Sequence, residues 1–147
     1  MQEAKKLCIA SDHAGWQLKQ VVIGYLSSLD IYPDDLGCYS EESVDYPEFG
    51  KKCGEAVASG KYDAGIAICG TGIGISIAAN KVKGIRCALC TSPEMAEFAA
   101  KHNNANILAL GGRTTSPELA IEILNTWMNT EFEGGRHKRR TDMLDAM

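Results

Sequence analysis

The sequence of 147 residues lacks any apolar run near the roughly 20 residues that a bilayer-spanning helix needs, which argues against a membrane span. It also lacks a basic excess, with 15 Lys and Arg against 19 Asp and Glu, so a general nucleic-acid binder is disfavoured. The N-terminal residues lack the layout of a signal peptide. The six cysteines are therefore expected to be reduced thiols of a cytoplasmic protein, not disulfides. The length fits one domain over residues 1–147.

Short apolar runs alternate along the chain with stretches of helical periodicity. Strands are predicted at 7–10, 64–69, 86–90 and 106–110, with a weaker edge strand at 31–36 that Pro33 interrupts. Helices are predicted over about 18–29, from Pro47, over 75–82, 93–102 and from Pro117, with a short one near 142–147. This order predicts an α/β fold, a three-layer Rossmann-like open sheet of about five parallel strands with helices on both faces.

In such sheets a ligand binds beyond the carboxyl ends of the strands. Asp12 and His13 follow the first predicted strand, and Arg113 follows the last one. His102 and Asn103 lie just before that last strand. A lone histidine in a loop is usually only solvated, but two of the three histidines border strands, which favours a functional role modestly.

A glycine-rich loop, Gly70–Gly74, separates a buried strand from a helix. Successive backbone N–H groups in such a loop can converge on an anion. The loop is neither a Walker loop nor a dinucleotide fingerprint, because no Gly-Lys-Ser/Thr follows and the spacing is GxGxG. A plain tight turn stays an alternative.

Cys69 directly precedes this loop, where a thiolate could act as base or nucleophile. A cysteine phosphatase is disfavoured, because the position six residues later holds Ile75 in place of the required arginine. Cys87 and Cys90 form a lone CxxC whose side chains point to opposite faces of a strand, which favours structural thiols over a zinc site.

Two arginines near the C-terminus are spaced for a shared role. Arg136 and Arg140 are four residues apart, which places them on one face of a helical turn. Guanidinium pairs of this kind bind phosphate oxygens. A solvated basic tail is an equally good interpretation of the spacing alone.

Five motifs together resemble the type B ribose-5-phosphate isomerases, a family that includes the galactose-6-phosphate isomerase subunits. They are SDHAG at 11–15, DYP at 45–47, ICGTGIGISIAANK at 68–81, HNNAN at 102–106 and EGGRH at 133–137. The resemblance runs nearly end to end and implies a single sugar-phosphate isomerase domain. It also implies a homodimer or dimer of dimers with the active site between two chains, and no metal or organic cofactor.

The resemblance implies an interconversion of ribose 5-phosphate and ribulose 5-phosphate through an enediolate. Cys69 is the implied base, and one family branch with a glutamate base after the loop is excluded by Ile75. His102 is implied in ring opening. The implied substrate-binding residues are Asp12, Tyr46, Asn103, the loop residues Gly70, Thr71, Gly72, Ile73 and Gly74, and the phosphate ligands His13, Arg113, Arg136 and Arg140.

Two alternatives remain at this level. The same chemistry on a six-carbon sugar phosphate, such as allose or galactose 6-phosphate, differs only in pocket length. A non-catalytic nucleotide-binding module could use the same glycine loop, but it would leave Cys69 and His102 unexplained.

Overall fold

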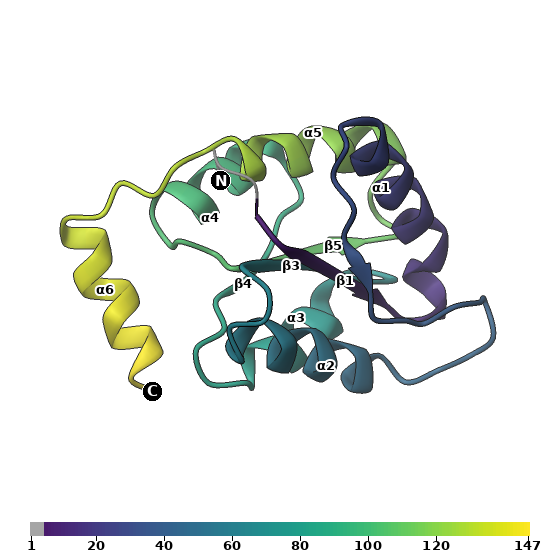
Figure 1. Ribbon diagram of the computed structural model, residues 1–147, viewed down its shortest axis with the longest axis horizontal. Coiled ribbons are helices and arrows are strands. Elements are labelled where there is room, and N and C mark those ends of the chain that lie inside the picture. Colours follow the sequence, from purple (N-terminus) through teal and green to yellow (C-terminus); the bar gives the residue numbers. More distant parts are fainter. Residues whose placement is uncertain (1–4) are drawn as a thin grey trace.

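A computed structural model describes residues 5–147 and shows a three-layer α/β architecture (Figure 1). The strands are β1 Leu7–Ser11, β2 Asp34–Asp35, β3 Ala64–Cys69, β4 Cys87–Leu89 and β5 Ile107–Gly111. The helices are a 3-10 turn His13–Gly15, α1 Trp16–Ser28, α2 Tyr46–Ala58, α3 Ile73–Asn80, α4 Pro93–Lys101, α5 Pro117–Met128 and α6 Arg136–Asp145. None of the helices among these residues is long and apolar enough to cross a membrane.

The five strands form one parallel sheet in the order β2-β1-β3-β5-β4. The prediction of a parallel α/β sheet is confirmed. The weak strand is also confirmed as an edge strand, although it shortens to Asp34–Asp35 because only two register pairs join it to β1. Leu7 pairs with Ala64 and Gly65 with Ile107, so the strands start and end together and their carboxyl ends share one edge.

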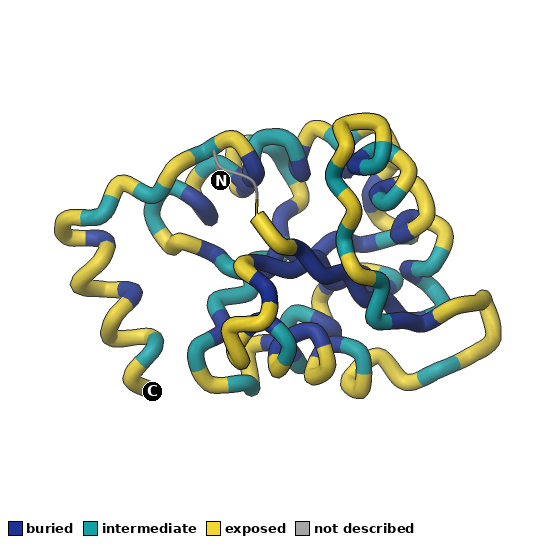
Figure 2. Tube along the Cα trace, viewed as in Figure 1, coloured by how far each residue is buried: buried dark blue, intermediate teal, exposed yellow. Residues whose placement is uncertain are grey.

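Alternating strand residues pack into two separate hydrophobic cores, one on each face of the sheet. Ile9, Ile66 and Leu108 pack against α1, α4 and α5 on one face. Cys8, Ala67 and Ile107 pack against α2 and α3 on the other. Figure 2 shows the central strands as a continuous buried band between these helices.

The prediction that Cys87 and Cys90 point to opposite faces of the sheet is confirmed. All six cysteines carry free thiols in this structure. Cys90 belongs to the core on the α4 and α5 face, whereas Cys87 packs against the core on the α2 and α3 face. Burial raises the pKa of Cys87 to about 12 and that of Cys90 to about 11, so both are protonated near neutral pH.

The predicted C-terminal helix is wrong in its bounds. Instead of a short helix near 142–147, α6 spans Arg136–Asp145 and begins directly after the Gly134-Gly135 pair. Both glycines have positive φ, at 70° and 57°, a backbone conformation that L side chains rarely adopt. Figure 1 shows α6 standing away from the sheet, beyond the amino ends of the strands.

Candidate active site

A first group of predicted site residues meets at the carboxyl edge of the sheet. We call it the carboxyl-edge cluster, and it consists of Asp12, His13, Tyr46, Cys69, loop 70–74 and Arg113. Backbone bonds hold its segments together, because Gly112 N donates to the Cys69 carbonyl at 2.8 Å and Arg113 N donates to the Gly70 carbonyl at 2.8 Å. The Arg113 guanidinium lies over Gly70, with Nη1 3.4 Å from where a Cβ would sit.

Cys69 ends β3 on the α2 and α3 face, and the residue is only 4% exposed. The backbone N–H of Gly72 donates to its Sγ at 3.2 Å. This N–H comes from the residue that precedes α3, where the helix dipole also favours negative charge. The thiol is therefore held beside a backbone donor at the entrance to the loop.

Gly72 has φ +79°, and a Cβ there would lie 2.5 Å from Leu89 Cδ1 and 2.9 Å from the Leu110 carbonyl carbon. We expect Gly72→Ala to lower the free energy of unfolding by ~1–3 kcal/mol and to displace the N–H from Cys69. If Cys69 is the base that the family resemblance implies, kcat for ribose 5-phosphate is expected to fall as well. Chemical denaturation and steady-state kinetics measure the two effects. Gly60→Ala is the matched control, because Gly60 has φ +85° but open space around it. An equal loss of kcat in both variants would contradict this interpretation.

Asp12 and His13 lie in the turn after β1. Asp12 is 6% exposed, and its Oδ1 accepts a hydrogen bond from Gly15 N at 3.0 Å, which caps the 3-10 turn. His13 Nδ1 accepts from Val44 N at 3.1 Å, so the neutral ring carries its proton on Nε2. Nε2 is thus the donor side of the neutral ring and could serve an anion.

The wall of this cluster is Tyr46, the first residue of α2. A Cβ on Gly74 would lie 2.6 Å from Tyr46 Cζ, so the ring packs directly on the glycine loop. The absence of a side chain at Gly74 is what lets the ring approach the loop this closely.

Lys19 is a supporting residue that sequence reasoning missed. Its side chain is fully buried, pairs with Asp35 Oδ1 at 2.6 Å and donates to the Cys38 carbonyl. It thereby fixes the loop that follows β2, which leads to Val44 and Tyr46. The sequence signal for this role is its position directly after Leu18, because Lys19 shares the buried face of α1 with Leu18, Val22 and Leu26.

A second group of predicted residues lies elsewhere in the chain. We call it the amino-edge cluster, and it consists of the predicted residues His102, Asn103, Arg136 and Arg140 together with Glu133 and His137. His102 caps the C-terminus of α4, five residues before β5 starts, and Arg136, His137 and Arg140 belong to α6. Cys69 pairs with the last residue of β5, so within one chain the two clusters lie at opposite edges of the sheet (Figure 1).

The amino-edge cluster is built from stacked rings and one carboxylate. The His102 and His137 rings are stacked, with centroids 4.1 Å apart and planes 8° apart. Glu133 Oε1 lies 3.6 Å from His102 Nε2 and 3.4 Å from His137 Nε2. Burial, together with the positive charges of His102 and Arg136, lowers the pKa of His137. Glu133 and His137 were not among the predicted site residues.

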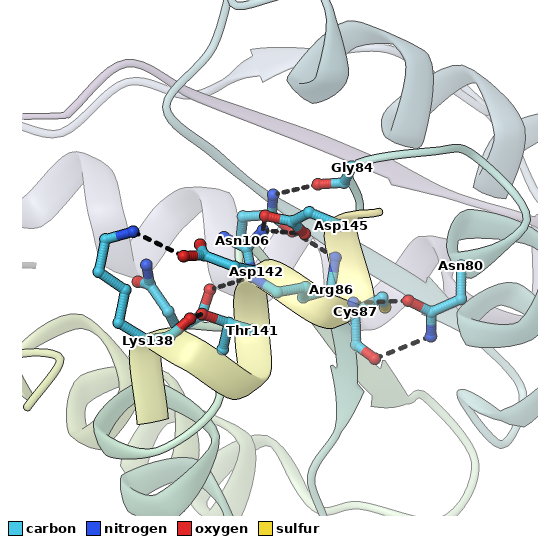
Figure 3. A network of polar contacts seen from close by, with 10 residues as sticks. Asn80, Gly84, Arg86, Cys87, Asn106, Lys138, Thr141, Asp142 and Asp145 are labelled. Atoms are coloured by element: carbon cyan, nitrogen blue, oxygen red, sulfur yellow. Dashed lines mark hydrogen bonds and ion pairs between the residues drawn. The ribbon is translucent and has the colours of Figure 1, made fainter. Parts of the chain in front are cut away.

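A polar network fixes the far end of α6 to the sheet, as Figure 3 shows. Arg86 Nη1 contacts both carboxylate oxygens of Asp145, at 2.7 and 3.0 Å. Asn106 accepts from Arg86 N at 2.7 Å and donates to the Gly84 carbonyl at 3.0 Å. The helix that carries Arg136 and Arg140 is therefore held at one end by this ion pair and at the other by the histidine stack.

A sequence profile described as Ribose/Galactose Isomerase matches residues 7–144. The chain belongs to this isomerase family. It is 42% identical over 143 residues to ribose-5-phosphate isomerase B of Escherichia coli, covering 97% of this chain and 96% of that protein. It also matches the crystal structure of a ribose 5-phosphate isomerase from Thermotoga maritima, with 51% identity and a TM-score of 0.95. That match covers 99% of this chain and 100% of the Thermotoga chain.

The ribose/galactose isomerase family also includes a relative with a ligand. Ribose-5-phosphate isomerase B from Mycoplasma genitalium has a crystal structure with bound ribulose-5-phosphate. It is 40% identical to this chain and matches with a TM-score of 0.90, covering 96% of this chain and 94% of that one. The shared fold and family are thereby established for this isomerase, whereas the roles of its individual residues stay predictions.

Proposed function

We propose that this chain interconverts D-ribose 5-phosphate and D-ribulose 5-phosphate through an enediolate, with Cys69 as the base. The observation that carries the proposal is the Cys69 thiol beside the Gly72 N–H, at 3.2 Å, within a family of sugar-phosphate isomerases. The base removes the proton from C2 of the open-chain aldose, and the proton is returned at C1.

The glycine loop supplies the second chemical requirement, which is stabilisation of the oxyanion. Charge develops on the sugar oxygens as the proton leaves, and preorganised donors act most strongly where charge develops. The backbone N–H groups of loop 70–74, which runs into the first turn of α3, are the donors that we assign to these oxygens. Asp12 is buried, and its N–H donates to the Ile68 carbonyl next to Cys69. It is assigned to a sugar hydroxyl, and Tyr46 to the pocket wall.

Ring opening and phosphate binding need the amino-edge cluster. His102 is assigned to the proton transfer that opens the furanose, and Asn103 to the sugar. The phosphate is assigned to Arg136 and Arg140 of this cluster, together with Arg113 and His13 of the carboxyl-edge cluster. Their N–H groups are donors matched to phosphate oxygens.

We infer that a second copy of the chain brings the two clusters together. The supporting observation is that Cys69 and His102 lie at opposite edges of one sheet. Facing His102 and α6 of one chain toward Cys69 of another completes a site that neither chain holds alone. The proposed assembly is a homodimer or a dimer of such dimers.

Loss of a phosphate ligand is expected to weaken substrate binding. Arg136→Met or Arg140→Met is expected to raise KM for ribose 5-phosphate roughly 10–100-fold, with a smaller effect on kcat, because a charged hydrogen bond contributes about 1.5–3 kcal/mol. Lys138→Met is the matched control on the same helix, since Lys138 pairs with Asp142 at 2.8 Å. If the KM of the arginine variants equalled that of the control, the phosphate would bind elsewhere.

The experiment that tests the proposed function is isomerisation of ribose 5-phosphate in the presence of EDTA, with allose 6-phosphate as the second substrate. We expect turnover with a kcat/KM that is higher for ribose 5-phosphate than for allose 6-phosphate. Preference for allose 6-phosphate would shift the assignment to a six-carbon substrate. Inactivity on both sugars, from a folded sample, would contradict the isomerase assignment.

A further inference from the structure

A fully buried lysine supports one side of the carboxyl-edge cluster. The Lys19 side chain of α1 is 0% exposed, and its Nζ pairs with Asp35 Oδ1 at 2.6 Å. The same Nζ donates to the Cys38 carbonyl and lies 5.3 Å from the centroid of the Tyr39 ring. Lysine is almost never fully buried unless it is paired, because its charge loses the solvation of water. All three contacts of Lys19 are with the stretch of chain that leads from β2 towards α2.

This stretch has few other features to hold it in place. Residues 39–45 form no helix or strand, and all of them except Val44 are exposed. Figure 1 shows them in the extended connection between β2 and α2, at the carboxyl end of the sheet. A segment that buries so little surface takes its position from a small number of polar contacts. Its position therefore depends on how its first residues are anchored.

Cys38 anchors the segment to the turn that carries His13. The Cys38 N–H donates to the Ser11 carbonyl at 2.7 Å, and the Ser11 N–H donates to the Gly37 carbonyl at 2.7 Å. Ser11 ends β1, two residues before His13. Lys19 binds the opposite side of Cys38, its carbonyl oxygen. The lysine thus fixes the start of the segment against the end of β1.

The same segment contacts His13 again at its other end. Glu41 Oε2 accepts from Gln17 Nε2 at 3.1 Å, and the Val44 N–H donates to His13 Nδ1 at 3.1 Å. Because Nδ1 accepts this bond, the neutral ring keeps its proton on Nε2. The position of the segment therefore decides which nitrogen of His13 is the donor and how the ring is held.

We propose that Lys19 is a positioning residue for phosphate binding. It holds residues 38–44 so that the Val44 N–H fixes the His13 ring with Nε2–H as the donor to the phosphate. This inference rests on the proposed function, in which His13 is a phosphate ligand. Lys19 itself is buried beneath this segment and acts only through the residues that it holds.

The first test is Lys19→Met, which keeps an unbranched side chain and removes the donor. KM for ribose 5-phosphate is expected to rise by up to ~10–100-fold, which is the loss of one hydrogen bond to a charged group, and kcat is expected to change less. Tyr25→Phe is the matched control on α1, because the Tyr25 hydroxyl donates to Asn125 at 2.7 Å, away from the segment. A KM in Lys19→Met equal to that of the control would overturn the proposal.

A double variant separates positioning from a loss of stability. Removing one partner of a buried ion pair is strongly destabilising, whereas replacing both partners by uncharged residues is often neutral. Lys19→Met/Asp35→Asn is therefore expected to recover Tm, and its asparagine can still accept the Gly37 N–H that Asp35 Oδ1 accepts at 2.9 Å. KM is expected to stay raised, because the Cys38 carbonyl still lacks its lysine donor. Recovery of KM together with Tm would mean that Lys19 acts through stability alone.

The route through His13 is tested by combining substitutions. Residues that act through one another have effects that do not add. Lys19→Met is therefore expected to raise KM much less in a His13→Gln background than in the wild type. Effects on KM that add in full would show that Lys19 does not act through His13, and would overturn the proposal.

Nuclear magnetic resonance of the full chain labelled with nitrogen-15 histidine gives a measurement that is independent of activity. The signals of His13, assigned by their absence in His13→Gln, are expected to show the Nε2–H tautomer in the wild type and a mixture of tautomers in Lys19→Met. This change in a chain that isomerises neither sugar would contradict the proposed function but leave the positioning of His13 in place. An active isomerase in which both proteins show the same tautomer would contradict the role of Lys19 alone.

Discussion

Replacing Cys69 by alanine is expected to lower kcat for ribose 5-phosphate by at least ~10²–10⁴-fold, which is the contribution of a well-placed general base. The thiol ends β3 and receives the Gly72 N–H at 3.2 Å. Substrate binding is expected to persist, because the assigned phosphate ligands and loop amides are unchanged. Steady-state kinetics give kcat, and calorimetry with ribose 5-phosphate gives the dissociation constant.

Cys87→Ala is the matched control for this variant. Cys87 is a half-buried thiol with its pKa raised to about 12 by burial, so it holds its proton at neutral pH and cannot serve as the base. Its replacement is expected to leave kcat near the wild-type value. Near-normal turnover in Cys69→Ala, or equal losses in both variants, would remove Cys69 from the proposed role.

Two inactive variants are expected to regain activity when their chains are combined. If each site joins Cys69 of one chain to His102 of the other, a heterodimer of Cys69→Ala and His102→Ala contains one site with both residues native. Random pairing of equal amounts then restores roughly a quarter of the wild-type sites. Co-expression with two affinity tags, followed by kinetics on the mixed and the isolated heterodimer, measures this recovery.

The double variant Cys69→Ala/His102→Ala provides the opposite control. Paired with wild-type chains, it gives heterodimers in which every site lacks one of the two residues. Activity is then expected to fall to roughly a quarter for equal amounts, instead of the half expected when each chain holds its own site. No recovery in the first mixture and half activity in the second would place the site within one chain.

The alternation of elements could be predicted from the sequence because it depends on local patterns. Ser92 and Ser116 each accept from the N–H three residues on and begin α4 and α5, as Ser-Pro pairs indicate. The continuous apolar run of β3 identified a strand that is buried along its whole length. Its last residue, Cys69, was therefore predicted at the carboxyl edge of the sheet.

The bounds of α6 could not be predicted, because its sequence has no apolar stripe. Only His137 and Thr141 are buried in this helix. It is held instead by the Arg86–Asp145 ion pair, which joins residues 59 positions apart, and by the stacking of His137 on His102. Contacts of that kind leave no periodic signal in the sequence.

The sequence by itself determined the parallel α/β fold, the glycine loop and the thiol at its entrance, because strand and helix periodicity and turn chemistry are local properties. Only the tertiary structure decided that the predicted site residues form two clusters at opposite edges of the sheet, and that Lys19, Glu133 and His137 belong to their surroundings. The physical reason is that strand order and helix docking bring together residues far apart in the chain. These long-range contacts depend on how buried surfaces and charges pair in three dimensions.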